Sequence, residues 1–194
     1  NVDSETAIHL KDIFLECVVA PSFDKEALEI LKVKKNLRIL KLSKDQLPKK
    51  NQNSTKSIMG GLLVQDTDDS EEKTENWISV TNKNPSNQIN LDLNFAWKIC
   101  KHVKSNAIVI AKDQKTIGIG AGQMNRVGAA KIALKAAGRL CSDAVLASDG
   151  FFPFADTVEL ANEYGIKAII QPGGSLRDQE SIDMCNLKGI SMIF

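Results

Sequence analysis

Histidine is scarce in this sequence, and its cysteines are widely spaced. The 194 residues include two histidines and four cysteines (Cys17, Cys100, Cys141 and Cys185), and no two cysteines form a CxxC pair. A structural zinc site draws its four ligands from such residues, often in closely spaced pairs, so we expect no zinc. Nothing in the sequence indicates secretion, where disulfides form. We therefore expect reduced, mostly buried thiols in a cytoplasmic protein.

The sequence also lacks an excess of charge and a long apolar run. Its formal net charge is +1, which gives no basic footprint of the kind that binds DNA or RNA. A membrane-spanning helix needs about 18 consecutive apolar residues, and no run here approaches that length. The first residues, NVDSETAIHLKDIF, do not have the basic and then apolar layout of a signal peptide. We expect neither a nucleic acid nor a membrane as partner.

What the sequence does contain is an alternation of helix-like and strand-like segments. Residues 4–16 have an apolar stripe with helical spacing after Ser4, which we take as the helix cap. A strand CVVAP, a helix SFDKEALEILKVKK and a strand NLRILKL follow, and both strands look too apolar for an exposed sheet. Residues 43–57 and 66–88 are polar insertions on either side of a strand GGLLVQD. We expect the first insertion to be a loop, and the second to be mobile or to cover a partner chain.

The second half of the sequence is more regular. A helix over residues 91–103 precedes two strands, SNAIVIAKD and TIGIGAG, which a polar turn at Asp113, Gln114 and Lys115 joins as a hairpin. Helices and strands then alternate from QMNRVGAAKIALKAAG to ISMIF. This order predicts an α/β fold with three layers, α/β/α, around a mixed sheet whose later strands are parallel.

Three loops of unusual composition should meet at one edge of this sheet, where open α/β sheets bind their ligands. The first is GIGAGQMNR, in which Gly118, Gly120 and Gly122 alternate before a helix start. Bare backbone of this kind allows a ligand to approach closely, or keeps a strand thin so that a helix can pack on it. Arg126 in the first helical turn opposes the helix dipole and favours an anionic partner.

The second loop, SDGFFPFAD, concentrates phenylalanines around Pro153 between two aspartates. Such a loop suits a flat nitrogen heterocycle, because rings cover its faces and a carboxylate accepts from its N–H groups. Alternatively the phenylalanines are core and Asp156 only caps the next helix. The third loop, QPGGSLRD, is also typical of an ordinary connection, with Ser175 as helix cap. Asn106, at the start of an apolar strand, either bridges loops or holds a substrate amide.

These motifs together resemble a known enzyme family. VKSNAIVIAKD, TIGIGAGQMNRV, SDGFFPFADTVELA and IIQPGGSLRD are similar to the AICAR transformylase part of the bifunctional enzyme AICAR transformylase/IMP cyclohydrolase. APSFDKEALEILKVKKNLRILKL and GGLLVQD are similar to it too, so the resemblance covers almost the whole chain. It implies a cytidine-deaminase-like fold, and formyl transfer from 10-formyltetrahydrofolate to the 5-amino group of AICAR ribonucleotide in de novo purine (IMP) biosynthesis. The product is FAICAR, and the active sites form across a homodimer.

The resemblance also implies roles for individual residues. Asn106 matches the family asparagine at the reacting amine and carboxamide, which makes it the catalytic candidate. The substrate-binding candidates are Lys34, facing the ribonucleotide phosphate, and the GQxSR-like segment Asn125, Arg126 and Val127. The folate-binding candidates are Phe151, Pro153, Phe154 and Asp156, whose carboxylate contacts the pterin. Some members bind potassium near the positions of Ser105 and Asp149.

The sequence departs from the family pattern in several places. Gly150 stands where alanine is usual, and Ala155 where many members have arginine. Residues 1–194 match only the C-terminal part of the transformylase domain: we find no counterpart of the IMP cyclohydrolase domain, of the first transformylase subdomain with its Lys-His pair, or of the terminal Arg- and His-containing tail. We therefore expect part of a site, inactive alone. The alternatives are a non-catalytic folate- or nucleotide-binding module, or a subunit completed by another chain; a zinc deaminase lacks its HxE and PCxxC motifs.

Overall fold

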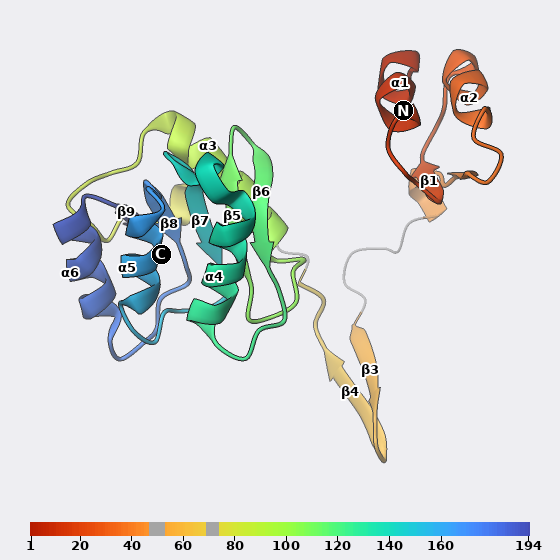
Figure 1. The fold of residues 1–194 in the computed structure, drawn as a ribbon. Helices are drawn as coiled ribbons and strands as arrows, with labels where there is room; N and C mark the ends of the chain where they lie inside the picture. The colour runs from red at the N-terminus through yellow and green to blue at the C-terminus, as the bar shows by residue number, and fades with distance from the viewer. Residues whose placement is uncertain (47–52, 69–73) are drawn as a thin grey trace. The chain divides into compact units, whose positions relative to one another are not determined.

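The computed structural model describes residues 1–46, 53–68 and 74–194. The chain divides into two compact units, Asn1–Glu71 and Glu72–Phe194 (Figure 1). Across the described ranges, no helix combines the length and the apolar character that crossing a membrane requires.

The first unit begins with two helices and two strands. They are α1 (Ser4–Lys11), β1 (Cys17–Ala20), α2 (Lys25–Lys32) and β2 (Arg38–Lys41), followed by a short 3-10 helix, η1 (Lys44–Gln46). The two strands pair in parallel, with Cys17 opposite Arg38. A small core of buried side chains joins strand to helices: Val2, Ala7, Ala20, Ala27 and Leu31.

Three expectations for this part were wrong. The first helix ends at Lys11, and Asp3 rather than Ser4 caps it, accepting from the Thr6 amide at 2.9 Å. Apolar residues 13 and 14 had extended the predicted stripe, yet Ile13 is 52% and Phe14 89% exposed. The two strands are covered on one face only: Ala20 lies in this core, whereas Val19 and Leu40, on the other face, are each 53% exposed. The apolar side chains of Val19 and Leu40 therefore remain exposed in the described part of the unit.

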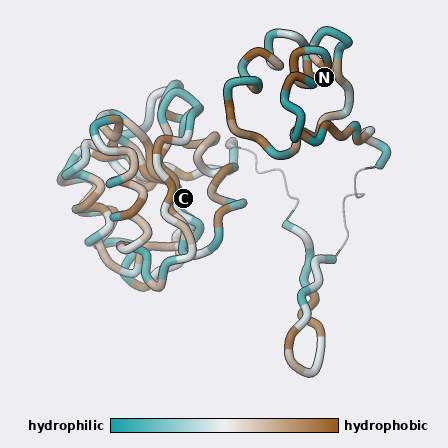
Figure 2. Tube along the Cα trace, turned by 45° about the vertical axis from the view of Figure 1, so that its right-hand side comes forward, coloured by the Kyte–Doolittle hydropathy of each residue, from teal (hydrophilic) through white to brown (hydrophobic). Residues whose placement is uncertain are grey.

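A hairpin of two strands completes the first unit. It consists of β3 (Ser54–Ile58) and β4 (Gly61–Gln65), paired antiparallel. The predicted loop over 43–57 was therefore wrong for its last residues, which belong to β3. Every residue of both strands is exposed, and Figure 2 shows that the tip of the hairpin is hydrophobic. The rest of that loop at 47–52, and residues 69–73 of the second polar insertion, lie outside the described residues.

The second unit is an α/β structure with a mixed sheet. Its elements are η2 (Thr74–Asn76), α3 (Asn87–Cys100), β5 (Ile108–Lys112), β6 (Lys115–Gly120), α4 (Arg126–Ala137), η3 (Gly138–Cys141), β7 (Val145–Ser148), α5 (Asp156–Glu163), β8 (Ala168–Ile170), α6 (Asp178–Lys188) and β9 (Ser191–Ile193). The strand order is β6-β5-β7-β8-β9. Strand β5 runs antiparallel to β6 and β7, whereas β7, β8 and β9 are parallel. The predicted order of strands and helices is confirmed here.

Helices cover both faces of this sheet (Figure 1). On one face, Leu93, Ala96 and Cys100 of α3 pack against Val109 and its neighbours. On the other face, α4, α5 and α6 pack over Ile108, Ile110, Leu146 and Ile169. Successive strand residues thus point into opposite cores, as expected for apolar strands buried on both faces. The likeness to a cytidine deaminase fold stays a prediction.

A buried carboxylate fixes the hairpin of β5 and β6 to α3. The turn is Asp113–Gln114, with positive φ values of 52° and 55°, as two-residue hairpin turns require. Asp92 of α3 is only 2% exposed and accepts from both turn amides, at 3.1 and 2.8 Å. The hairpin was predicted correctly, but the turn has one residue fewer because Lys115 belongs to β6.

Part of the second polar insertion pairs with β9, the outer strand of the sheet. Ile78 exchanges two backbone hydrogen bonds of 2.9 Å with Phe194, and the Val80 amide donates to the Met192 carbonyl at 3.0 Å. This segment contains the WISV residues, and it runs antiparallel beside β9. Helix α3 begins at Asn87, earlier than predicted, because Ser86 caps it by accepting from the Ile89 amide at 3.4 Å.

Candidate functional site

The carboxyl ends of β6, β7, β8 and β9 and the start of β5 lie at the same end of the sheet in the second unit. Ile108, at the start of β5, lies opposite both Gly120 and Ser148. Ile170 in turn lies between Ala147 and Ile193. The loops after β6, β7 and β8 therefore meet at the edge where β5 begins, as the sequence predicted.

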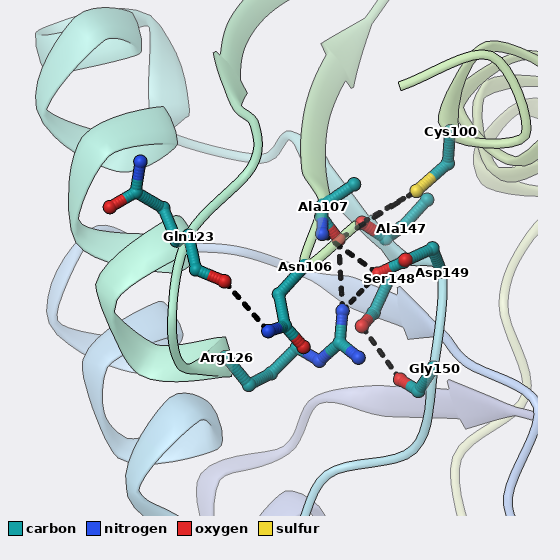
Figure 3. A network of polar contacts seen from close by, with 9 residues as sticks. All are labelled: Cys100, Asn106, Ala107, Gln123, Arg126, Ala147, Ser148, Asp149 and Gly150. Atoms are coloured by element: carbon teal, nitrogen blue, oxygen red, sulfur yellow. Dashed lines mark hydrogen bonds and ion pairs between the residues drawn. The ribbon is translucent and has the colours of Figure 1, made fainter. Parts of the chain in front are cut away.

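A buried ion pair joins two of these loops. The Nη1 of Arg126, the first residue of α4, donates to Oδ1 of Asp149, and the two side chains are 10% and 17% exposed (Figure 3). The same Oδ1 accepts from the Ala107 amide at 2.8 Å, while Arg126 Nη1 also donates to the Ala107 carbonyl at 3.4 Å. The protein itself thus supplies the anion that an arginine at a helix start favours. Among the described atoms the Nε of Arg126 is buried without a partner.

Burial and the contacts of this network shift the pKa values of Asp149 and Cys100. Burial raises the pKa of Asp149, but hydrogen bonds from Ser105, the Ala107 amide and Arg126 outweigh it, so that the pKa falls below its ordinary value. Burial, together with the Asp149 charge, raises the pKa of the Cys100 thiol to about 12. Its Sγ lies 3.8 Å from the Ala107 carbonyl and 3.7 Å from the Ala147 carbonyl. This thiol is protonated at neutral pH and is therefore no nucleophile.

Asn106 lies beside the ion pair and bridges two loops. Its Nδ2 donates to the Gln123 carbonyl at 2.7 Å, and backbone hydrogen bonds of 3.4 Å join the two residues in both directions (Figure 3). The peptide bond between Ser105 and Asn106 is cis. The bridging interpretation is confirmed by these contacts. They hold the amide of Asn106 at the sheet edge, half-buried.

The aromatic loop after β7 divides its phenylalanines between core and surface. Phe152 is fully buried, whereas Phe151 is 46% and Phe154 is 49% exposed. The core interpretation therefore holds for Phe152 alone. The guanidinium of Arg177 stacks on the Phe154 ring, 4.6 Å from its centroid, and two hydrogen bonds of 2.6 Å to Glu180 hold that guanidinium. This contact joins the second loop to the third.

Asp156 does not cap its helix in the predicted way. Helix α5 begins at Asp156 itself, after Ala155, and no side-chain cap hydrogen bond forms. The Asp156 Oδ1 accepts from the amide of Thr157 at 2.7 Å and from its hydroxyl at 3.4 Å. The carboxylate is exposed, and Oδ2 accepts from no donor in the described residues. One carboxylate oxygen is thus available to a ligand.

The glycines of the first loop serve packing more than ligand approach. A Cβ on Gly118 would collide with the carbonyl oxygen of Ala133, and one on Gly120 with that of Ala129, both in α4. At these two positions, the interpretation that glycine keeps the strand thin so that a helix can pack on it is therefore confirmed. Gly122 differs, since its φ of +65° favours glycine.

Other candidate residues also have structural roles. The Asn125 side chain caps α4, accepting from the Gly128 amide at 2.7 Å. Lys34 belongs to the first unit, where its Nζ donates to the carbonyls of Leu10 and Ile13. Ser175 was expected to cap the last helix, but α6 begins at Asp178, and the Ser175 hydroxyl accepts from the Arg177 amide at 3.1 Å.

Comparison with known proteins identifies the family. The family model described as the AICARFT/IMPCHase bienzyme matches residues 1–136. The chain belongs to the AICARFT/IMPCHase family. It is 97% identical over 194 residues to the bifunctional purine biosynthesis protein PurH of Prochlorococcus marinus strain AS9601, and 58% identical over 194 residues to that of strain MIT 9211. It spans 38% of the length of each of these relatives.

Solved structures add little to this assignment. Acinetobacter baumannii RibD, form 2, matches 54% of this chain and 34% of its own with a TM-score of 0.38 and 18% sequence identity. We draw nothing from so distant a likeness.

The cation implied by the AICARFT/IMPCHase resemblance fits this site poorly. Within the described ranges, no group of three or more His, Cys, Asp or Glu side chains could hold a metal ion. Oδ1 of Asp149, proposed with Ser105 for potassium, is engaged by the Ala107 amide and by Arg126. The guanidinium would repel a cation there, so we derive no step through potassium.

Sequence reasoning missed Arg177 in this site. The pair Arg177 and Glu180 has the helical i, i+3 spacing and was readable in SLRDQE. Its contact with Phe154 depends on two loops that are adjacent only in the folded chain.

Proposed function

We propose that this chain carries part of the AICAR transformylase site of its family. The reaction transfers a formyl group from 10-formyltetrahydrofolate to the 5-amino group of AICAR ribonucleotide, giving FAICAR in purine biosynthesis. The observation that carries this proposal is the pair of half-exposed rings, Phe151 and Phe154, beside the available Oδ2 of Asp156. The family has two activities, so membership alone does not say which of them this chain serves. We choose between them from the chemistry of the aromatic loop.

The aromatic loop suits the pterin of the folate. Arg177 covers one face of Phe154, and the residue is still 49% exposed. Pro153 stiffens the loop between the two exposed rings. A flat heterocycle stacked there would present ring N–H groups, and Asp156 Oδ2 is an acceptor for them.

The polar network would hold the acceptor substrate next to the folate. Asn106 carries a carboxamide that can pair with the carboxamide of AICAR ribonucleotide. Because Arg126 is engaged by Asp149 and Ala107, we assign it a positioning role: it ties the start of β5, and hence Asn106, to the aromatic loop. Val127, another substrate-binding candidate of this unit, follows Arg126 on α4.

The transfer itself needs a base that these residues do not supply. The amine nitrogen forms a bond to the formyl carbon while the bond from that carbon to N10 of the folate breaks, and a proton moves from the amine to N10. A carboxamide such as that of Asn106 cannot take up this proton at neutral pH. We propose that the base comes from another part of the longer relatives or from the second copy in a homodimer, so that this chain alone is inactive.

Calorimetric titration tests the folate part of this proposal. We expect a non-reactive folate analogue to bind residues 1–194, and Asp156→Ala to weaken that binding about tenfold through the lost charged hydrogen bond. Glu159→Ala is the matched control, because it removes an exposed carboxylate one turn further along α5. AICAR ribonucleotide and ATP are titrated in parallel. Equal affinities for the wild type and Asp156→Ala, or no heat with the analogue, would contradict the proposed pterin site.

A further inference from the structure

Arg177 joins two loops of the candidate site that are distant in the sequence. Its guanidinium carbon lies 4.6 Å from the centroid of the Phe154 ring, within the roughly 6 Å at which a cation attracts an aromatic face. Phe154 precedes α5, which begins at Asp156, and Arg177 precedes α6, which begins at Asp178. The contact therefore connects the segments that enter these two helices.

Glu180 fixes the orientation of this guanidinium. Nε and Nη2 of Arg177 donate to Oε1 and Oε2 of Glu180, each at 2.6 Å. A two-point contact of this kind defines how the guanidinium lies relative to the carboxylate. The hydrogen bond from Arg177 also holds the pKa of Glu180 below its ordinary value, so the pair stays charged at neutral pH.

The backbone around Arg177 is held as well. Its amide donates to Ser175 Oγ at 3.1 Å. Oδ2 of Asp178 accepts from the amides of Gly174 and Ser175 at 2.7 and 3.1 Å. Arg177 is therefore anchored to the start of α6 through both its backbone and its side chain, and Phe154 stacks on a fixed group.

These contacts order a ring more than they stabilise the fold. The side chains of Arg177 and Glu180 are 47% and 48% exposed, and Phe154 is 49% exposed. Exposed ion pairs and exposed cation–π contacts add little to stability. Asp156, two residues after Phe154, offers Oδ2 as an acceptor. A heterocycle that stacks on the ring and donates to Asp156 needs both groups in place at once, and a ring that is already ordered lowers the entropy cost of binding.

We propose that Arg177 is a positioning residue of the folate site. It stacks on Phe154 and keeps the ring in the orientation in which a flat heterocycle stacks on it, while Glu180 keeps Arg177 in place. Arg177 thus acts on the ligand through Phe154. This inference rests on the proposed function, which supplies the ligand for the ring.

Arg177→Met tests this role, because it keeps a long apolar side chain and removes the guanidinium. In residues 1–194 with ¹³C-labelled phenylalanine, NMR relaxation should show a more mobile Phe154 ring than in the wild type. The Kd of the non-reactive folate analogue should rise about fivefold, since the ligand must now order the ring. Glu180→Gln keeps one acceptor oxygen and should raise the Kd about twofold. Urea denaturation should be unchanged in both variants, because the side chains are exposed.

Two further variants separate the positioning role from a general effect. Gln179→Met replaces an exposed side chain of the same helix, whose Nε2 donates to Asp183 at 2.8 Å, and it should change neither the ring nor the Kd. Phe154→Leu identifies the ring resonances and completes a double-mutant cycle. Without the ring, Arg177→Met should change the Kd by less than about twofold.

The outcomes distinguish this inference from the proposed function. Unchanged ring mobility or an unchanged Kd in Arg177→Met overturns the positioning role and leaves the proposed folate site intact. A rise in Kd that is equally large in the Phe154→Leu background does the same. Failure of the wild type to bind the analogue contradicts the folate site and the positioning role together.

Discussion

Arg126 and Asp149 form a buried ion pair that ties the first turn of α4 to the loop after β7. Their side chains are 10% and 17% exposed, and Asp149 also accepts from the Ala107 amide. One carboxylate therefore fixes three chain segments at the candidate site. A buried charge that loses its partner is costly, so this pair should dominate the stability of the site.

Removing the charge of Asp149 should destabilise the fold strongly. We expect Asp149→Asn to lower the free energy of unfolding by about 3 kcal/mol, since it leaves the guanidinium of Arg126 buried and unpaired. The control is Asp143→Asn, which removes an ion pair with Lys167 whose side chains are 61% and 51% exposed. That loss should stay below about 1 kcal/mol. Urea denaturation of both variants measures the difference, and equal losses would contradict the buried pair.

Acid should weaken the same interaction. Because the pKa of Asp149 in the folded chain lies below its ordinary value, the unfolded chain binds a proton here more readily. The stabilisation is complete above about pH 4 and is lost as the pH falls through the folded-state pKa. The difference in unfolding free energy between the wild type and Asp149→Asn should therefore narrow at acidic pH. A difference that is constant down to the acid transition would refute this.

Asp92 should stabilise the hairpin of β5 and β6 from outside it. We expect Asp92→Ala to cost about 2 kcal/mol, because two backbone amides of the turn lose their buried acceptor. Asp92→Asn keeps one acceptor oxygen and should cost about half as much. Urea denaturation gives both values, and hydrogen exchange at Asp113 and Gln114 shows whether the turn opens. Unchanged exchange in Asp92→Ala would show that the carboxylate does not hold the turn.

Gly118 should tolerate no side chain. We expect Gly118→Ala to lower the free energy of unfolding by about 3 kcal/mol, since the new methyl group meets the Ala133 carbonyl of α4. Gly61→Ala is the control: a Cβ there meets nothing within 4 Å. It should change stability by less than about 0.5 kcal/mol. A Gly118→Ala variant as stable as Gly61→Ala would reopen the possibility that the bare backbone exists for a ligand.

The sequence predicted the second unit better than the first, for physical reasons. In the second unit, strands with buried faces alternate with helices, so the pattern and the turn residues agree. In the first unit, Ile13 and Phe14 continued an apolar stripe although both are exposed, and pattern alone cannot show that a packing partner is absent. The pairing of Ile78 with Phe194 joins residues far apart in the chain and has no local signal.

The candidate site was predicted in outline but not in its internal contacts. The prediction that the three loops lie together beyond the carboxyl ends of the strands was correct. The composition did not show that Arg126 finds its anion in Asp149, or that Phe152 alone of its loop joins the core. These outcomes depend on distances between loops, which sequence spacing does not contain.

The central claim is that residues 1–194 carry part of the transformylase site, and the two activities of the family allow a direct test. The matching region of the 97% identical PurH relative is replaced by residues 1–194, with and without Asn106→Ala and Asp156→Ala. Formyl transfer to AICAR ribonucleotide and cyclisation of FAICAR are then assayed separately. We predict that Asn106→Ala lowers formyl transfer at least about a hundredfold, that Asp156→Ala lowers it about tenfold at subsaturating folate, and that both leave cyclisation unchanged. Loss of cyclisation with formyl transfer intact would contradict the account and assign this chain to the cyclohydrolase.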